Sequence, residues 1–467
     1  MKKATELEQF REELYQTFNN RADALMDLVD AISSYPEAKS VVEYSEAPCY
    51  RRSYSTIAKA LNTMQLNKMT LPRLISHYLP KPKKRNFVLI GVDVTPQPRP
   101  YAYTLQDRGM VYEPTVVKGN KPVTIGHQYS TLCYLPEEEE GVTSSWVVPL
   151  QTERVPTDAD KELVGTNQIA SLLEDETLPF AQQLCVDVAD SSYSKPACLH
   201  KNRHHPNLVS IARVRGSRTL YRQPIQTAKA KTGAGHPTWY GEEFKLPDSS
   251  TWHSPDETLT VTEHSRRGKV YRVEIQAWHN ILMPGKRKPI RIPMHKHPFT
   301  LVRIVRFHED GTLACKHPLW LVVIGSRRHE LSLADIYQAY RQRFDLEHFF
   351  RFGKQKLLLA RFQTPEHWRE ENWWQLVHIA YAQLWLARSL ATCLPRPWER
   401  NLPAYKQKLL SPSGVRRDFG RIIRQIGSPA APPKPRGISP GRPLGTRLEP
   451  RPKQKVVVKS QKQANAP

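Results

Sequence analysis

A nearly continuous apolar run, FVLIGVDVT at 87–95, constrains the fold of this chain more than any other stretch. A strand with one face in water would alternate polar and apolar residues, and this run does not. We therefore predict a central strand buried on both faces. Further strands are predicted at 144–151 and 183–190, with a helix at 167–173 between them. Strands that alternate with helices indicate an α/β core.

Residues 213–325 follow a different pattern. KVYRVEIQAW at 269–278 alternates apolar and polar positions, and LVRIVRF at 301–307 and LWLVVIG at 319–325 follow it without a helical segment. Alternation with a period of two is typical of strands. The segment is therefore predicted to be a β-rich block placed before a long helix.

The first part of the chain is predicted to be helical. Apolar residues at helical spacing predict an amphipathic helix, and they are Leu7, Phe10, Leu14, Phe18, Leu25 and Leu28. SYSTIAKALNTM at 53–64 and LNKMTLPRLISHYL at 66–79 predict two short helices about a turn. These two helices are either a DNA-reading helix-turn-helix or a plain helical hairpin.

The formal net charge of +24 predicts an anionic partner, which is either nucleic acid or a membrane surface. The most apolar window, 373–394, is long enough to span a bilayer but contains Gln375, His378, Gln383 and Arg388, which are costly in lipid. We expect a buried core helix there and no membrane. No charged-then-apolar leader opens the sequence, and the six cysteines are scattered, so a cytoplasmic, nucleoid-associated protein with reduced thiols is expected.

The last segment, 428–467, contains nine Lys or Arg residues against one Glu, and nine prolines. Such a composition cannot bury a core, so the segment is expected to be disordered and cationic.

A single helix face is predicted to carry four polar residues, Tyr340, Arg343, Glu347 and Lys354. Ser332 fits a capping box three residues before an acid, and the helix is expected to continue to 352 or beyond. At about 100° per residue the four side chains fall on one narrow face. Such a face is either a solvated, salt-bridged stripe or a functional surface.

Two aspartates in predicted strands add to this face. Asp93 lies in the apolar run, where an unpaired carboxylate would be costly, so a cation must accompany it. Asp190 follows the strand at 183–190, and Asp187, on the other strand face, is its rival. Two strand carboxylates with Glu347 provide the oxygen ligands of a two-metal phosphoryl-transfer site. Asp190 as a plain helix N-cap is the alternative.

The spacing of Tyr340, Arg343, Glu347 and Lys354 resembles the Y-x2-R-x3-E-x6-K signature of bacterial insertion-sequence transposases with a DDE triad. GVDVT around Asp93 and VADSSYS at 188–194 also resemble this family. The resemblance covers roughly 85–400 and implies an RNase H-like catalytic core interrupted by a β-rich insertion.

The resemblance implies roles for the residues that match. Asp93, Asp190 and Glu347 would hold two Mg²⁺ ions, for which Mn²⁺ can substitute. The expected DNA-binding residues are Tyr340, Arg343 and Lys354 for phosphates and Trp252 for a flipped base, with Trp239 and Trp278 as alternatives to Trp252. Stacking of a base on an aromatic ring contributes about 1–3 kcal/mol.

The predicted function is cut-and-paste DNA transposition, and a homodimer of the family type is expected to bind terminal inverted repeats and target DNA. A repurposed, inactive DNA-binding protein and another RNase H-like nuclease are the alternatives. The predicted segments are an N-terminal helical DNA-binding region at 1–84, a core at 85–212, the β-rich insertion at 213–325, the rest of the core at 326–400 and a basic segment at 401–467.

A second group of metal-compatible residues occurs in CLHKNRHH, where Cys198, His200, His204 and His205 lie close together in the sequence. It falls in a basic turn and has no second ligand pair at a matching spacing, so the sequence does not favour a zinc site there.

Overall fold

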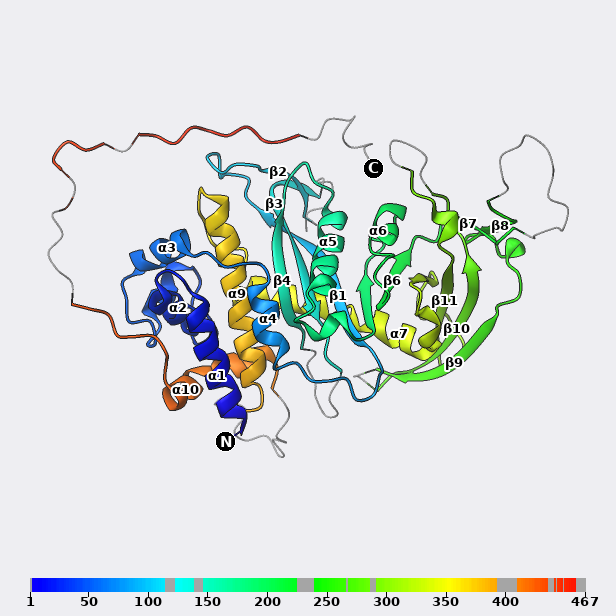
Figure 1. Cartoon of the computed structure of the whole chain (residues 1–467), viewed down its shortest axis with the longest axis horizontal. Coiled ribbons are helices and arrows are strands. Elements are labelled where there is room, and N and C mark those ends of the chain that lie inside the picture. The colour runs from blue at the N-terminus through cyan, green and yellow to red at the C-terminus, as the bar shows by residue number, and fades with distance from the viewer. Residues whose placement is uncertain are drawn as a thin grey trace. The chain divides into compact units, whose positions relative to one another are not determined.

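The computed structural model describes residues 2–113, 122–137, 146–224, 239–265, 268–285, 291–392, 410–435, 441, 443–447 and 449–458. The chain forms two compact units (Figure 1). Unit 1 comprises Met1–Lys81, Val94–Val164 and Asp345–Ser460, and unit 2 comprises Pro82–Asp93, Gly165–Phe344 and Gln461–Pro467. Strand β1 (Val88–Pro98) and helix α5 (Lys161–Glu174) each begin in one unit and end in the other.

Unit 2 is built on a sheet with the strand order β1-β5-β6-β12-β11-β10-β9. β1, β5 and β6 are parallel, and the other neighbours are antiparallel. The bounds are Cys185–Ala189 for β5, Leu208–Val214 for β6, Glu257–His264 for β9, Val270–Ile281 for β10, Phe299–His308 for β11 and Leu319–Ile324 for β12. Short strands β7 (Thr219–Tyr221) and β8 (Glu243–Lys245) pair separately. The strands of the predicted β-rich block therefore continue the sheet that includes β1, and Figure 1 shows β9, β10 and β11 side by side.

The burial of the strands follows their sequence patterns. In β1, Leu89, Ile90 and Val92 are all fully buried, which confirms a strand covered on both faces. In β10, Val273 and Ile275 are buried while Arg272 between β9 and β11 is exposed, as the alternation predicts. The mixed α/β architecture predicted from the sequence is confirmed.

Helix α7 (Leu333–Gln342) packs against β5, β6 and β9. Its predicted capping box is present: the side chain of Ser332 accepts a hydrogen bond from the backbone N–H of Asp335, and the Asp335 side chain accepts one from the Ser332 backbone N–H. These two bonds satisfy N–H groups that the first turn of a helix leaves without partners. The start of the helix is therefore fixed by the residues that predicted it.

The prediction of one helix from Ser332 to 352 is wrong. α7 ends at Gln342 and α8 (Asp345–Lys356) begins after a turn. The N–H of Arg343 donates to the carbonyl of Tyr340 at 3.2 Å, three residues back, so the last turn tightens and the α-helical ladder stops. The face calculated for an unbroken helix therefore does not apply to all four signature residues, although Glu347 and Lys354 keep a common face within α8.

Unit 1 is organised around α9 (His367–Ala387), which contacts α1, α2, α3, α10 and β4. Trp373, Trp374 and Leu384 are fully buried, so the apolar window is a core helix as predicted. Among the described helices, none has the length and apolar character that a membrane crossing requires. The other helices of the unit are α1 (Lys2–Thr17), α2 (Ala22–Ser34), α3 (Tyr54–Thr63), α4 (Thr70–Ser76), α8 and α10 (Pro412–Ile426).

The N-terminal apolar residues fall on two helices where one was predicted. Leu7 and Leu14 lie on α1, Leu25 and Leu28 lie on α2, and all four are fully buried. The chain breaks at Arg21, whose left-handed φ of 53° cannot continue a right-handed helix. The two short helices predicted after residue 53 are α3 and α4, and their reading of DNA stays a prediction.

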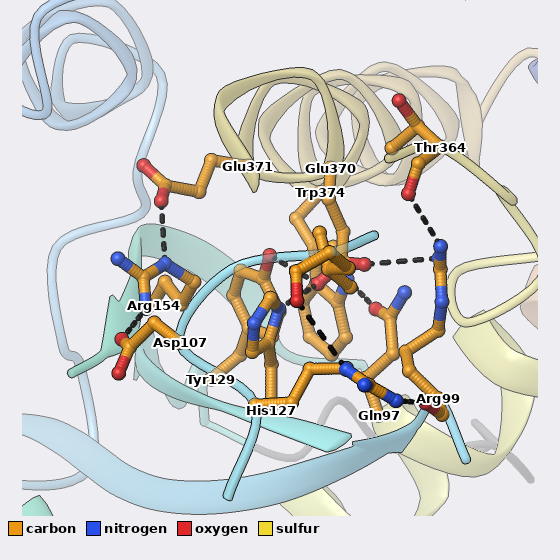
Figure 2. A network of polar contacts seen from close by, with 12 residues as sticks. Gln97, Arg99, Asp107, His127, Tyr129, Arg154, Thr364, Glu370, Glu371 and Trp374 are labelled. Atoms are coloured by element: carbon orange, nitrogen blue, oxygen red, sulfur yellow. Dashed lines mark hydrogen bonds and ion pairs between the residues drawn. The ribbon is translucent and has the colours of Figure 1, made fainter. Parts of the chain in front are cut away.

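A buried polar network ties α9 to the strands of unit 1 (Figure 2). The carboxylate of Glu370 accepts hydrogen bonds from Arg99 Nη1 at 3.0 Å and from the Tyr129 hydroxyl at 2.9 Å, and lies 2.7 Å from His127 Nδ1. Tyr129 also stacks on Trp374, with ring centroids 4.0 Å apart. A buried charge needs such partners. Here His127 and Tyr129 on one strand and Arg99, the residue after β1, provide them.

The strands of unit 1 are β2 (Gly109–Tyr112), β3 (Val123–Tyr134) and β4 (Val148–Val155), and β2 and β4 both pair with β3. The described part of the C-terminal tail lies against this unit. Val457 donates its N–H to the carbonyl of Arg108 at 2.8 Å, and Gln454 donates to that of Tyr103 at 2.7 Å. The predicted disorder of the tail is thus not confirmed for these residues.

Candidate active site

The two predicted aspartates lie in one row across the parallel strands of unit 2. β1 pairs with β5 so that Ile90 is opposite Asp187 and Gly91 opposite Val188. Each pair differs by 97 positions, and 190 − 93 = 97, so the same register continued by two residues puts Asp93 opposite Asp190. Both aspartates therefore lie two residues beyond the last pair of two adjacent strands, and adjacent strands are about 4.8 Å apart.

The same row continues onto β6. Ala189 is opposite Ala212, so Asp190, the first residue after β5, is followed across the sheet by Arg213. The sequence analysis did not single out Arg213. Arg213 is noticeable in the sequence, because LVSIARV at 208–214 is apolar apart from Ser210 and Arg213. Its position relative to Asp190, however, follows only from the pairing of the strands.

Asp187, the rival of Asp190, lies on the opposite face and is buried. It is opposite Ser210 in β6, and the Ser210 hydroxyl donates a hydrogen bond to its carboxylate. Burial raises the pKa of Asp187 to about 7. The carboxylate of Asp190 is more accessible and oriented by its own turn, since Oδ1 accepts bonds from the Ser192 N–H at 2.9 Å and hydroxyl at 2.5 Å.

Asp93 has the cationic partner that its position required. Arg343 Nη1 lies 3.8 Å from Asp93 Oδ2, and the Asp93 side chain is 23 % exposed. Asp93 is not at the end of its strand, because β1 continues to Pro98. The pair therefore places an arginine beside a carboxylate that still reaches solvent.

Tyr340 completes this group in unit 2. The Arg343 guanidinium lies 5.8 Å from the centre of the Tyr340 ring. Burial raises the pKa of the Tyr340 hydroxyl; the charges of Arg343 and Arg213 oppose this rise and that of Asp190 adds to it. Those influences show that the ring on α7 lies close to both arginines and to Asp190. Unit 2 thus brings together Asp93, Asp190, Tyr340 and Arg343.

Glu347 and Lys354 belong to unit 1. Glu347 is half-buried in the first turn of α8, where a carboxylate is favoured by the helix dipole. Lys354 Nζ donates to the carbonyl of Pro96 at 2.9 Å, and Pro96 is three residues beyond Asp93 in the sequence of β1. Two helical turns separate Glu347 from Lys354, so both side chains leave α8 on the same face.

The three candidate tryptophans have different surroundings. Trp278 is 1 % exposed and donates from Nε1 to the carbonyl of His253 at 2.8 Å, so it is a core residue. Trp252 is half-buried, and the Arg303 guanidinium lies 5.3 Å from its ring centre.

Trp239 lines a cavity of about 180 Å³. Its ring stacks on that of His295 at 4.2 Å with an interplanar angle of 3°, and the Arg291 guanidinium lies 5.1 Å from the ring centre. Trp239 and Trp252 are partly exposed, and Trp278 is not.

A model of DDE superfamily endonucleases matches residues 13–283, more than half of the chain. The protein belongs to this family of nuclease- and transposase-type enzymes, for which DNA is the implied substrate and divalent metal ions are typical. The match includes Asp93 and Asp190 and ends before Glu347. No curated protein matches the chain.

The donor set on this row fits a hard divalent cation. Mg²⁺ prefers oxygen ligands, and the two carboxylates are adjacent, on one face, and in the case of Asp93 accessible to solvent. Arg343 and Arg213 beside them offer guanidinium groups suited to phosphate oxygens. Carboxylate and guanidinium groups therefore lie near each other in unit 2.

Proposed function

We propose that the protein is an insertion-sequence transposase that binds terminal inverted repeats, cleaves DNA at the element ends and joins the freed ends to target DNA. The observation that carries this proposal is the row of Asp93, Asp190 and Arg213, with Arg343 and Tyr340 beside it. Membership of the DDE family makes DNA its substrate. The Y-R-E-K spacing supports the insertion-sequence type within that family.

In this proposal Asp93, Asp190 and Glu347 hold two Mg²⁺ ions. Glu347 is assigned to them by the signature spacing. Bound divalent ions would supply a nucleophile at neutral pH and stabilise the charge that develops on the scissile phosphate. The two aspartates provide carboxylate oxygens as metal ligands. Two hydrogen bonds from Ser192 orient the carboxylate of Asp190.

The cationic side chains position the DNA. Arg343, which lies 3.8 Å from Asp93, would turn its guanidinium to a phosphate when a divalent ion takes its place at the carboxylate. Tyr340 and Lys354 are assigned to phosphates near the cleaved end. Trp252, or Trp239 as the alternative, stacks on an extruded base.

The rest of the chain provides sequence-independent affinity. With a net charge of +24, binding should fall steeply with salt, because each neutralised phosphate releases counterions. Helices α3 and α4 and the basic tail are assigned to the inverted repeats, and a homodimer is assigned to the pairing of two ends. The nucleoid is the corresponding location.

Glu347→Gln tests this proposal. The substitution keeps the shape of the side chain and removes its charge, so Mg²⁺-dependent cleavage of duplexes taken from the DNA flanking the coding region should fall at least about 10³-fold. Binding of the same duplexes in a gel-shift assay should stay within about twofold, since phosphate contacts dominate affinity.

Glu309→Gln is the matched control, because Glu309 is an exposed acid after β11. It should cleave like the wild-type protein. A wild-type protein that binds the ends but never cuts them would favour a repurposed DNA-binding protein over a transposase, and retained cleavage in Glu347→Gln would remove Glu347 from the site.

A further inference from the structure

Three side chains with metal-ligand chemistry converge in unit 2, away from the row of Asp93 and Asp190. Glu174 is the last residue of α5, and His204 and His205 lie in the turn between α6 (Pro196–Lys201) and β6. One ligand atom from each lies within 4.8 Å of the other two. We propose that these residues bind a divalent transition-metal ion of the zinc class and that this ion clamps α5 to the turn before β6.

The distances suit such an ion after a small adjustment. His205 Nε2 and Glu174 Oε1 are 3.9 Å apart. Ligand atoms in a tetrahedral zinc site, with bonds of about 2.0–2.1 Å, are about 3.3 Å from each other. The Glu174 side chain is 62 % exposed, so it can move toward the histidines without disturbing the core.

The buried nitrogen of His205 is an independent sign of a ligand. Nε2 is shielded from solvent and has no hydrogen-bond partner among the described residues. A buried polar atom without a partner destabilises the folded protein. Coordination of an ion by Nε2 would recover this cost, whereas the neighbouring carboxylate at 3.9 Å is too far away to accept a hydrogen bond.

The turn is held in place independently of any ion. Buried Asn202 donates from Nδ2 to the carbonyl of Thr166 on α5 at 2.9 Å. At the other end of the turn, Asn207 donates to the carbonyl of Ala181 at 2.8 Å and accepts a bond from Arg327 at 2.9 Å. The histidines therefore sit on a turn fixed at both ends, and such a preorganised site loses little entropy when it binds an ion.

The chemistry of the three ligands separates this site from the magnesium site of the proposed function. Two imidazoles and one carboxylate suit zinc, cobalt or nickel, whereas Mg²⁺ prefers a set made of oxygen atoms. Three protein ligands leave one position for water.

The residues that the sequence grouped together take different places. Cys198 is buried on α6, and His200 packs against His297, with ring centroids 5.1 Å apart. Glu174, distant in the sequence, provides the third ligand in their stead.

Zinc uptake by the tag-free, full-length protein tests the proposal. Equilibrium dialysis against Zn²⁺ in millimolar Mg²⁺, which occupies the oxygen sites, should leave about one Zn²⁺ per chain. Glu174→Ala and His204→Ala, both at exposed positions, should weaken this binding at least tenfold. His77→Ala, at an exposed position on the other unit, should bind zinc like the wild type.

Thermal melting provides a second readout. Zn²⁺ should raise the melting temperature of the wild type and of His77→Ala but not of the two site variants. Circular dichroism without metal establishes that the variants are folded. Absence of zinc uptake by the wild type, or site variants that bind as tightly as His77→Ala, would overturn the proposal, and neither result bears on DNA cleavage.

Discussion

Replacing Glu370 by glutamine should destabilise unit 1 strongly, because a neutral amide leaves the buried Arg99 guanidinium without its counter-ion (Figure 2). One carboxylate oxygen accepts from Arg99 and the other faces Tyr129 and His127. A glutamine puts an NH₂ donor at one of these two places. With its oxygen toward Arg99, the amide can donate to the Tyr129 hydroxyl or to His127 Nδ1, but the charge of Arg99 is no longer neutralised.

The magnitude follows from burial. The Arg99 and Glu370 side chains are 2 % and 0 % exposed. Removing one partner of a buried ion pair costs about 3–5 kcal/mol, since the other charge stays in a medium of low polarity. Arg99 keeps its bonds to the carbonyls of Phe362 and Thr364, which places the expected cost at the lower end of that range. The melting temperature should fall by roughly 6–12 °C.

Glu371→Gln is the control, one residue away on the same helix. Glu371 pairs with Arg154 at 2.7 Å but is 35 % exposed, and pairs at the surface contribute about 0–1 kcal/mol. Thermal melts followed by circular dichroism compare the two variants with the wild type. Equal losses, or a Glu370→Gln protein as stable as the wild type, would refute the view that the buried network holds α9 to the strands.

Two further tests concern the strands and helices around Asp93. Burial raises the pKa of Asp187 to about 7, above about 3.9 in the unfolded chain. Folding therefore takes up a proton between these values, and wild-type stability falls as the pH rises from about 4 to 7. Asp187→Asn should be more stable relative to the wild type at pH 8 than at pH 5, and an equal difference in melting temperature at both pH values would contradict this. Arg343→Ala and Lys354→Ala should weaken complexes with element ends and reduce cleavage, with only a small loss of melting temperature. Arg341→Ala should neither weaken these complexes nor reduce cleavage. Large losses of stability in the first two variants would make these residues structural.

The strands could be predicted because their information is local. The run at 87–95 lacks the alternating polar residues that an exposed strand face would need. An acid within it is therefore conspicuous without any knowledge of the fold. The period of two in 269–278 identified β10 in the same way. The choice of Asp190 over Asp187 was also available locally, because residues three apart on a strand point to opposite faces.

The features that the sequence did not reveal depend on residues far apart. His127 and Glu370 are separated by 243 positions, and nothing in either neighbourhood indicates the other. Glu174 ends α5, and the Asn202 bond to Thr166 on that helix, 36 positions away in the sequence, helps to hold the histidine turn close to it. The break after Gln342 was missed for another reason: Arg343 and Phe344 are compatible with a helix, and tertiary packing overrides so weak a preference.

The charge balance around Asp93 and Asp190 affects how the proposed site would bind divalent metal ions. Arg343 already lies 3.8 Å from Asp93, so two divalent ions would add a large uncompensated positive charge in the absence of DNA. Phosphate groups provide the missing negative charge, and they bind more tightly where metal ions are present. By thermodynamic linkage the effect is mutual: DNA should raise the affinity for Mg²⁺ by the same factor by which Mg²⁺ raises the affinity for DNA. Replacing Arg343 by alanine removes one positive charge, so it should tighten metal binding by the protein alone while weakening the complex with DNA.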